Sequence, residues 1–581
     1  MARTVSIGIQ DFEKIRQENY FYIDKTKMIR EWWESGDGVT LIARPRRFGK
    51  TLNMSMLEKF FSVKYAGRGE LFDGLSVWQE EKYRRLQGTF PVIFLSFANV
   101  KEPGYRGTRL SINRILEDIY NKNIFLLEGD LLTDNEKDYF RSVTFDMAEE
   151  TAVWALHKMS DFLGRYYGKK VIILLDEYDT PMQEAYVNGY WEEMASLIRS
   201  LFNSTFKTNP YLERAVMTGI TRISKESIFS DLNNLKVVTT TSDSYADCFG
   251  FTEEEVFNAL EEFGLSGMKQ QVKDWYDGFT FGRKRDIYNP WSIINFLDEK
   301  KVGAYWANTS ANSLVGKLVR EGSPEIKMTM ERLLQGESFE TSFDEQIVFS
   351  NLDQEEQAVW SLLLASGYLK VKRHEVCESQ YGEWKEKYEL ELTNFEVKTM
   401  FRGMIRKWFG RVTSYYNDFI KALLLDDVRA MNIYMNRVTV EVFSYFDTGN
   451  QPSGAEPERF YHGFVLGLMV ELTDRYAVTS NRESGFGRYD IMLEPRVIPC
   501  ASEDMGGPDG AGGNGRDAVI IEFKVQDEDE KELSDTVQTA LRQIEGKDYQ
   551  ANLIAKGIPA ERIRKYGFAF CGKKVLIGGS K

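Results

Sequence analysis

The chain has 581 residues, of which 43% are hydrophobic and 28% are charged, and its formal net charge at pH 7 is −14. This length exceeds what a single hydrophobic core supports, so we expect roughly three or four domains of ordinary globular composition. The acidic balance argues against a protein that coats nucleic acid over its whole surface, although local basic patches can still bind phosphate.

Cysteine and histidine are scarce in this chain. The four cysteines lie far apart and form no C-x-x-C pair, which argues against both a disulfide framework and a zinc site. Only three histidines occur, so any metal site must rest on carboxylates. No apolar run is long enough to span a membrane, and the N-terminus MARTVSIGIQ lacks an apolar signal core. We therefore expect a cytoplasmic protein without a membrane partner.

The first motif lies between residues 38 and 61. The apolar stretch GVTLIA predicts a buried strand, and KTLNMSMLEKFF predicts a helix with apolar residues near one face. The turn between them ends in Gly49-Lys50-Thr51, as a phosphate-binding loop does. Arg44, however, stands where the first glycine of G-x-x-x-x-G-K-[ST] is expected.

Strand, glycine-containing turn and helix together predict a nucleotide site. Backbone N–H groups and the helix N-terminus would hold the phosphates, Lys50 would reach the β- and γ-phosphates, and the Thr51 hydroxyl would bind Mg²⁺. The loop alone leaves open a basic turn that caps an ordinary helix. The loop residues expected to contact the nucleotide are Arg46, Arg47, Phe48, Gly49, Lys50, Thr51 and Leu52.

A second motif, KKVIILLDEYDTP at 169–181, has an apolar run that ends in Asp176-Glu177. Such a run suits a central parallel strand, and ligands of open α/β sheets bind at the carboxyl ends of strands. Asp176 could bind Mg²⁺ directly or through a water, and Glu177 could polarise the attacking water. A strand followed by an acidic turn is the alternative.

Two further stretches, FPVIFLSF at 90–97 and RAVMTGITRI at 214–223, predict strands of the same sheet. The second ends in polar Thr218, Thr221 and Arg222, as expected of a strand between the loop and acidic strands that senses the γ-phosphate. The sequence is equally compatible with an Arg222 that pairs with a local carboxylate. Alternation of helical and strand patterns predicts an α/β fold with a doubly wound parallel sheet.

The stretches IGIQDFEKIRQENYFYIDKT (7–26), RPRRFGKTL (44–52), LLDEYDTP (174–181) and TGITRISKESIFSDLNNL (218–235) resemble the AAA-ATPase-like family over about the first 300 residues. This is a prokaryotic group of P-loop ATPases commonly fused to a PD-(D/E)xK nuclease-like domain. The resemblance implies ATP binding and hydrolysis by Lys50, Thr51, Asp176 and Glu177, and makes Arg44 the family's form of the loop. It also implies that the stretch around Tyr22, Asp24 and Lys25 lies near the nucleotide.

We expect the P-loop domain to span 1–249 and a helical lid to span 250–344. Thr252 and Glu255 form a capping box at the start of a lid helix, and the aromatic residues of 275–297 suit a lid core better than a base-stacking platform. Residues 345–450 predict a winged-helix-like unit or a helical connector, with a linker bundle at 413–447. The basic stretch RGMIRKWFGR (402–411) favours a solvated helix face over DNA contact.

A second constellation lies near the C-terminus. GFGRYDIMLEP (485–495) places Asp490 at the start of a strand, and AVIIEFKV (518–525) carries Glu522 and Lys524. On a strand these two side chains point the same way, while Ile521 and Phe523 face the other side. Two carboxylates beside a lysine can form an oxygen-ligand Mg²⁺ site with a water-orienting ammonium. A salt-bridged strand end is the plain alternative.

The region of about 455–575 resembles the PD-(D/E)xK core of the same family through its motifs RYD and IIEFKV and the following helix ALRQI…Y. We expect a restriction-endonuclease-like α/β domain at 451–581. The resemblance implies Asp490 and Glu522 as metal ligands and Gln543 as a polar residue beside the active site. On a continuous helix Lys547 shares the face of Gln543, whereas Tyr549 does not and is expected to pack. The glycine-rich stretch 497–517 is expected to be a hairpin-tip insertion, and Glu471 is more typical of an exposed helix end than of a ligand.

The leading hypothesis is therefore an ATP- and Mg²⁺-dependent nuclease, in which ATP gates cleavage of nucleic acid, with DNA favoured. The alternative is a nucleotide-switch regulatory protein whose nuclease-like domain only binds, which the acidic balance favours. A third possibility is an ATPase inactivated by Arg44. A homo-oligomer is left open.

Overall fold

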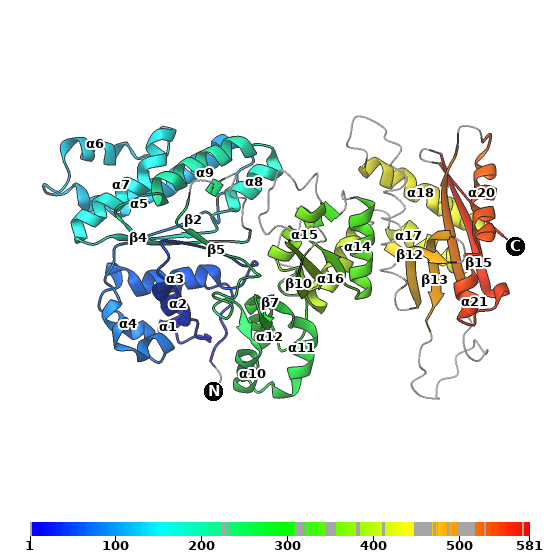
Figure 1. Ribbon diagram of the computed structural model, residues 1–581, viewed down its shortest axis with the longest axis horizontal. Coiled ribbons are helices and arrows are strands. Elements are labelled where there is room, and N and C mark those ends of the chain that lie inside the picture. Colours follow the sequence, from blue (N-terminus) through cyan, green and yellow to red (C-terminus); the bar gives the residue numbers. More distant parts are fainter. Residues whose placement is uncertain are drawn as a thin grey trace. The chain divides into compact units, whose positions relative to one another are not determined.

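The computed structural model describes residues 3–221, 228–229, 232–307, 315–316, 318–319, 323–342, 356–378, 384–408, 413–446, 467–468, 472, 475–484, 487–496, 517–527, 530–571 and 574–580 (Figure 1). The chain forms two compact units. The first contains Met1–Val315 and Ser338–Thr399, and the second contains Gly316–Glu337 and Met400–Lys581. The chain therefore passes between the units three times.

The first unit is built on a five-stranded sheet in which every neighbouring pair is parallel. In spatial order the strands are β2 (Val92–Ser96), β3 (Val171–Asp176), β4 (Leu212–Gly219), β1 (Val39–Ala43) and β5 (Leu235–Val238). The predicted α/β class is confirmed. Since β4 lies between β1 and β3, the carboxyl ends of the loop strand, the acidic strand and the expected sensor strand share one edge.

Helices cover both faces of this sheet, as the apolar β1 and β3 require. Figure 1 shows α5, α7 and α9 on one face and α2 and α3 on the other. The helices of this region are α1 (Phe12–Gln17), α2 (Lys27–Ser35), α3 (Lys50–Phe61), α4 (Glu81–Leu86), α5 (Tyr105–Lys122), α6 (Asp134–Ser142), α7 (Glu149–Tyr167), α8 (Thr180–Asn188) and α9 (Trp191–Phe206).

The expected lid region is not purely helical. Helices α10 (Glu253–Glu262), α11 (Lys269–Tyr276) and α12 (Pro290–Glu299) accompany a small sheet in the order β6 (Phe251–Thr252), β8 (Lys284–Tyr288) and β7 (Phe279–Phe281). The capping box of Thr252 and Glu255 is present as predicted. Many of the region's aromatic side chains are buried in one cluster with Val256, Leu260 and Ile293, which confirms a packing role.

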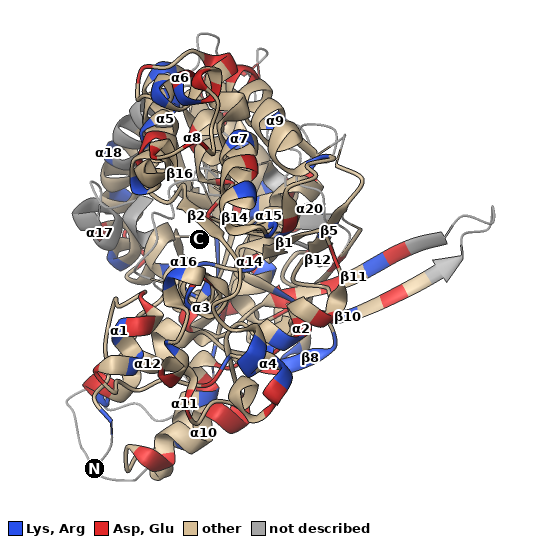
Figure 2. Ribbon diagram, turned by 90° about the vertical axis from the view of Figure 1, so that its left-hand side faces the viewer, with Lys and Arg blue, Asp and Glu red and all other residues tan. Residues whose placement is uncertain are grey.

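A helix and a hairpin complete the first unit. They are α15 (Glu356–Ala365), β10 (Leu369–Glu378) and β11 (Trp384–Leu392), and β9 (Phe339–Thr341) pairs with β11. Figure 2 shows the hairpin projecting, with basic and acidic residues on both strands. Cross-strand ion pairs such as Lys370–Glu391 and Lys372–Glu389 account for those charges.

The second unit contains a mixed sheet in the order β12 (Tyr476–Ser484), β13 (Gly487–Pro495), β14 (Ala518–Val525), β15 (Ile563–Cys571) and β16 (Lys574–Gly579). The pair β14–β15 is parallel and the other pairs are antiparallel. Among the described residues, the remaining α-helices are α14 (Pro324–Gln335), α16 (Phe395–Trp408, shared with the first unit), α17 (Thr413–Leu424), α18 (Val428–Phe446), α20 (Leu533–Gly546) and α21 (Ala551–Ala555).

The helices of 413–446 are not a separate linker bundle. In Figure 1, α17 and α18 lie on the opposite face of the sheet from α20. Arg564 of β15 donates to the carbonyl of Leu424 at the end of α17 at 3.1 Å, and Tyr566 donates to Asp426 at 2.5 Å. These helices therefore form one layer of an α/β/α sandwich.

Helix α18 also closes one edge of that sheet. The amide of Asn432 donates to the Ile577 carbonyl at 2.9 Å and accepts from the Ile577 N–H at 2.8 Å. Asn436 does the same with Val575 at 2.7 and 2.9 Å. Four residues of helix rise about 6 Å and two residues of strand advance about 6.6 Å, so this spacing lets two side-chain amides stand in for a neighbouring strand.

Among the helices that the structure describes, none is both long enough and apolar enough to cross a membrane. Part of the basic stretch 402–411 lies outside the described residues.

Candidate active sites

The phosphate-binding loop has the predicted position between β1 and α3. Gly49 is the N-cap of α3 with φ of 80°, in the left-handed region that glycine adopts without strain. Helix α3 therefore begins at Lys50 and directs its first backbone N–H groups toward the loop.

Lys50 is buried, and its ammonium donates to the carbonyls of Arg44 at 3.0 Å and Pro45 at 2.8 Å. Burial lowers the pKa of Lys50, and the nearby charges of Glu177 and Asp176 oppose that effect. The ammonium thus bonds to its own loop, at the base of the region that phosphates would occupy.

Asp176, at the end of β3, contacts both the start of α3 and the end of β4. Its Oδ2 accepts a hydrogen bond from Thr51 Oγ1 at 2.7 Å, and its Oδ1 accepts one from Thr218 Oγ1 at 2.5 Å. Asp176 and Thr218 are fully buried. The predicted Mg²⁺ residues Thr51 and Asp176 are therefore in direct contact. The second hydrogen bond, from Thr218, holds the Asp176 carboxylate in place.

A pocket of about 740 Å³ opens over this edge of the sheet, within the usual size of a small-molecule site. All seven loop residues predicted to contact the nucleotide line it, as does Glu177. Glu177 has φ of 52° and accepts a hydrogen bond from Thr180 Oγ1 at 3.2 Å. The left-handed backbone of Glu177 is the kind of local cost often found at functional sites.

The N-terminal stretch closes part of this pocket. Tyr22 and Lys25 line it, as expected. Asp24 does not, because its carboxylate binds Thr26 N at 2.8 Å and Ser76 N at 2.7 Å. Lys25 pairs with Glu255 at 2.7 Å, so the stretch is tied to the lid.

Arg44 neither blocks the pocket nor lines it. It is fully buried and donates to the carbonyls of Thr239 at 2.5 Å and Ser244 at 3.1 Å, with its guanidinium 4.5 Å from the centre of the Phe281 ring. Burial lowers the pKa of Arg44 to about 10. The side chain that replaces the first glycine therefore anchors the loop to the segment after β5, pointing away from the phosphate region.

Arg46 and Arg47 do line the pocket. Arg46 donates to Gln183 Oε1 at 3.3 Å, and the Arg47 guanidinium lies 4.2 Å from the centre of the Trp291 ring in the lid. Arg222 lies outside the described residues. Strand β4 ends at Gly219, so Thr221 belongs to the turn that follows.

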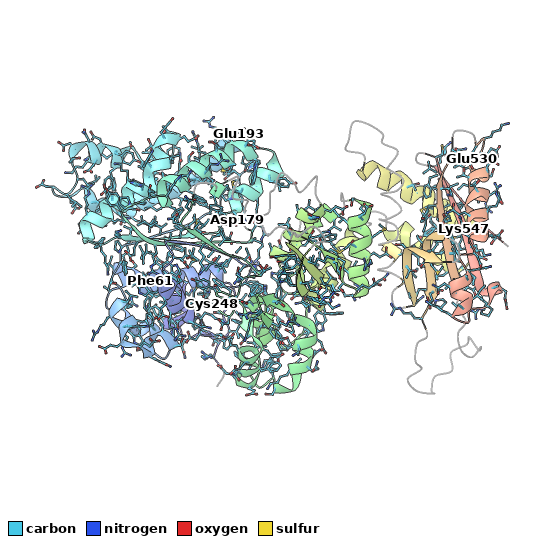
Figure 3. The ribbon with its side chains drawn as sticks, viewed as in Figure 1. Phe61, Asp179, Glu193, Cys248, Glu530 and Lys547 are labelled. Atoms are coloured by element: carbon cyan, nitrogen blue, oxygen red, sulfur yellow. The ribbon has the colours of Figure 1, made fainter. Side chains whose placement is uncertain are left out.

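Sequence reasoning missed three residues near this site: Asp179, Asn289 and Trp306. Trp306 Nε1 and Asn289 Nδ2 both donate to the carbonyl of Arg46, at 3.1 and 3.4 Å. Asp179 stands three residues after Asp176 at the same sheet edge, where Figure 3 labels it. Its place within the acidic motif was the one available signal.

The second constellation assembles on β13 and β14. Asp490 lies within β13 and not at its start, and its Oδ2 accepts a hydrogen bond from the Phe523 N–H at 2.8 Å. Glu522 is buried, and burial together with the charge of Asp490 raises the pKa of Glu522 to about 8, against a lowering by Lys524. Glu522 Oε2 is buried with no hydrogen-bond partner among the described residues.

Gln543 of α20 donates from Nε2 to Glu522 Oε1, which brings it beside the acidic pair as expected. The same Nε2 lies 3.0 Å from the hydroxyl of Tyr549. The Lys547 N–H still donates to the Gln543 carbonyl at 3.0 Å, one helical turn away, but Asp548 then adopts φ of 51° and ends the helical geometry, so the expectation that Tyr549 lies away from Gln543 is wrong. The chain then turns back, so buried Tyr549 packs as expected and also meets Gln543, while Lys547 is exposed.

Glu471 and most of the glycine-rich stretch 497–517 lie outside the described residues. One further group, Glu31, Asp247 and Cys248, brings its ligand atoms within 4.8 Å of one another. Each already has a protein partner: Tyr245 N for Glu31 at 2.6 Å, Lys27 for Asp247 at 2.7 Å, and Glu31 itself for the Cys248 thiol at 3.5 Å. This cluster is satisfied without a metal.

Both constellations lie in regions that match known protein families. Residues 6–229 match the AAA-ATPase-like family, described as a predicted AAA-ATPase, and residues 456–579 match the PD-(D/E)XK nuclease superfamily. The chain fuses an AAA-ATPase-like domain to a PD-(D/E)XK nuclease superfamily domain. Both resemblances expected from the motifs are thereby confirmed.

The AAA-ATPase-like domain contains the loop, Asp176 and β4, and the nuclease superfamily domain contains Asp490, Glu522 and Gln543. One similar protein is an "Uncharacterized protein in vnfD 5'region" of Azotobacter chroococcum mcd 1. It is 27% identical over 400 residues, and the match covers 68% of each chain.

Proposed function

We propose that the AAA-ATPase-like domain binds and hydrolyses ATP with Mg²⁺, and that this controls a Mg²⁺-dependent phosphodiesterase of the nuclease superfamily domain, acting on nucleic acid and on DNA in particular. The observation that carries the proposal is that Thr51, which lines the pocket, and Thr218 both bind the buried carboxylate of Asp176.

In the ATP site the loop, the start of α3 and the acidic residues have different roles. Backbone N–H groups at the start of α3 bind the phosphates, and Lys50 leaves the carbonyls of Arg44 and Pro45 to pair with them. Two oxygens 2.7 Å apart, from Thr51 and Asp176, suit a hard cation. A Mg²⁺ held by Thr51 and Asp176 would neutralise charge on the phosphates. Glu177, which lines the pocket, orients the attacking water.

In the nuclease site the buried Oε2 of Glu522 supports a metal, because a carboxylate oxygen without a hydrogen bond is costly unless a cation meets it. Asp490 supplies a second oxygen, and Gln543 holds Glu522 from the other side. Glu522 and Asp490 would hold a Mg²⁺, which would supply a water of lowered pKa and polarisation of the phosphodiester. Lys524, half-buried on the same side of β14, steadies the charge that develops there.

Binding of a fluorescent ATP analogue tests the first site. Lys50→Ala should weaken binding by roughly two orders of magnitude, since it removes the cation that meets the phosphates. Lys64→Ala alters an exposed lysine outside the pocket and should bind as the wild type does. Unchanged affinity in Lys50→Ala would refute the P-loop assignment.

Cleavage of labelled DNA and RNA, with and without Mg²⁺ and ATP, tests the second site and its control. Lys524→Ala should abolish cleavage and keep ATP hydrolysis, whereas Lys531→Ala, at an exposed lysine, should keep both. If neither the addition of ATP nor the Lys50→Ala substitution changes the cleavage rate, the proposal that ATP controls cleavage is refuted.

A nucleotide switch with a binding-only nuclease-like domain is the second candidate, favoured by the net charge of −14. ATP hydrolysis without cleavage of any nucleic acid tested, together with ATP-dependent capture of a partner, would replace the nuclease proposal with this one.

A further inference from the structure

The carboxylate of Asp179 is almost completely buried, with 1% of its surface exposed. Its Oδ2 accepts hydrogen bonds from the backbone N–H groups of Ile220 at 3.0 Å and Thr221 at 2.9 Å, and from the Thr221 hydroxyl at 2.8 Å. All three donors belong to the turn that follows β4. One oxygen therefore fixes that turn against the end of β3.

Tyr178 holds the same turn from its other side. Its backbone N–H donates to the Thr218 carbonyl at 3.0 Å and its hydroxyl donates to the Thr221 carbonyl at 2.8 Å. A Cβ at Gly219 would come within 2.6 Å of the Tyr178 ring and 2.7 Å of Asp179 Oδ1. Only glycine lets the two segments approach this closely, so the acidic motif and the end of β4 form one interlocked structure.

Asp179 also connects this turn to the phosphate-binding loop. Gln183, one helical turn later in α8, donates to Asp179 Oδ2 at 3.0 Å and accepts from Arg46 at 3.3 Å. Asp179, Gln183, Arg46 and Ile220 all line the pocket. The charge of Asp179 additionally acts to raise the pKa of Lys50. Its contacts thus reach the ends of β3 and β4 and the loop after β1.

We propose that Asp179 is a positioning residue for ATP hydrolysis, which sets the turn after β4 and Arg46 at fixed places around the γ-phosphate. This inference rests on the proposed ATPase function. Thr218 is separated from the turn only by Gly219 and binds Asp176, so a shift of the turn moves the hydroxyl that orients the carboxylate proposed to bind Mg²⁺. A misplacement of about 1 Å in an active site can cost about 100-fold in rate.

Steady-state ATP hydrolysis and ATP binding, measured on full-length Asp179→Asn, test the proposal. The amide keeps the size of the side chain but loses the charge and one acceptor oxygen. We expect kcat to fall by about 100-fold while the Kd for ATP changes by less than about threefold, because the phosphate cradle at Gly49–Thr51 is untouched.

Matched variants separate positioning from general damage. Asp161→Asn removes another largely buried carboxylate, in α7 and paired with Arg165, and should leave kcat and Kd unchanged. Gln183→Ala removes the bonds of Gln183 with Asp179 and Arg46 but keeps the bonds of Asp179 with the turn, so it should lower kcat by a smaller factor than Asp179→Asn. If Asp179→Asn fails to fold, Gly219→Ala displaces the same turn with the carboxylate retained and should give the same loss of kcat.

Wild-type kcat in Asp179→Asn, or a Kd that rises in parallel with the loss of kcat, would overturn the positioning role. The failure of the proposed function looks different: the wild-type protein itself would bind or hydrolyse no ATP.

Discussion

The buried carboxylate of Glu396 accepts a hydrogen bond from the backbone N–H of Trp306 at 2.6 Å. The indole Nε1 of Trp306 donates in turn to the carbonyl of Arg46 in the phosphate-binding loop, at 3.1 Å. Glu396 lies in the first turn of α16 and also accepts from Ser292 Oγ of the lid at 2.8 Å. One carboxylate thus joins the lid and a loop-contacting tryptophan to the start of α16.

Glu396 should make stability depend on pH. Burial raises the pKa of Glu396 to about 7, from an ordinary value of 4.5, against hydrogen bonds that lower it. The folded protein therefore retains this proton to higher pH than the unfolded chain does. The resulting stabilisation, on the order of 3 kcal/mol, is complete below about pH 4.5 and is lost as pH rises through about 7.

Thermal melts of wild type and Glu396→Gln between pH 5 and pH 8 check this. The wild-type midpoint should fall relative to that of the variant as pH rises, because glutamine does not titrate. Glu299→Gln, at an exposed position in α12, should follow the wild type. Parallel pH profiles for wild type and Glu396→Gln would contradict the prediction.

Arg44 should be required for stability. Arg44→Gly restores the general P-loop pattern but leaves the carbonyls of Thr239 and Ser244 without their buried donor. We expect the unfolding free energy to fall by about 3 kcal/mol or more in chemical denaturation. Arg283→Ala, which removes an exposed arginine paired with Asp243, should change it by less than about 1 kcal/mol. A fully stable Arg44→Gly would mean that the anchoring contacts are dispensable.

Glu522 should lower the stability of the metal-free protein. Its burial beside Asp490 disfavours the charged form, so Glu522→Gln should raise the unfolding free energy by on the order of 2 kcal/mol at pH 7. Mg²⁺ should raise the melting midpoint of the wild type and not that of the variant, because binding to the folded state stabilises it. Glu545→Gln, at an exposed acid of α20, serves as the control. An equal response to Mg²⁺ in Glu522→Gln would exclude Glu522 as a ligand.

The amide pair on α18 should protect the edge of the second sheet. Asn432→Ala with Asn436→Ala leaves the N–H and C=O groups of Val575 and Ile577 unpaired, at about 1–3 kcal/mol for each buried group. An open strand edge also promotes pairing between molecules. Faster hydrogen exchange at these amides and a concentration-dependent increase in light scattering should follow, but not in the exposed control Asn552→Ala. Unchanged hydrogen-exchange rates at the Val575 and Ile577 amides would show that α18 does not protect them from solvent.

Local pattern predicted the parts of the sites that lie within one strand, loop or helix. The sequence around Lys50 specifies strand, glycine turn and helix, and the alternation in AVIIEFKV places Glu522 and Lys524 on one side of a strand. The same reasoning failed at Tyr549, because a single left-handed residue, Asp548, ends the helical geometry on which the spacing argument depended. Asp is among the few non-glycine residues enriched in that conformation, but most Asp residues do not adopt it, so the residue type alone does not locate the turn.

By itself the sequence determined that this protein has a glycine-containing turn between a strand and a helix, a strand that ends in two acidic residues and a D…ExK pair, because each is a short pattern of neighbouring residues. Only the tertiary structure decided what Arg44, Asp179 and Trp306 do. Their partners are remote in the chain: Asp179 and Thr221 are 42 residues apart, and Trp306 and Arg46 are 260 apart. Such pairs meet through the order of the strands and the packing of the segment after residue 250 against the loop. The long-range packing of apolar surfaces fixes both, and no local periodicity encodes them.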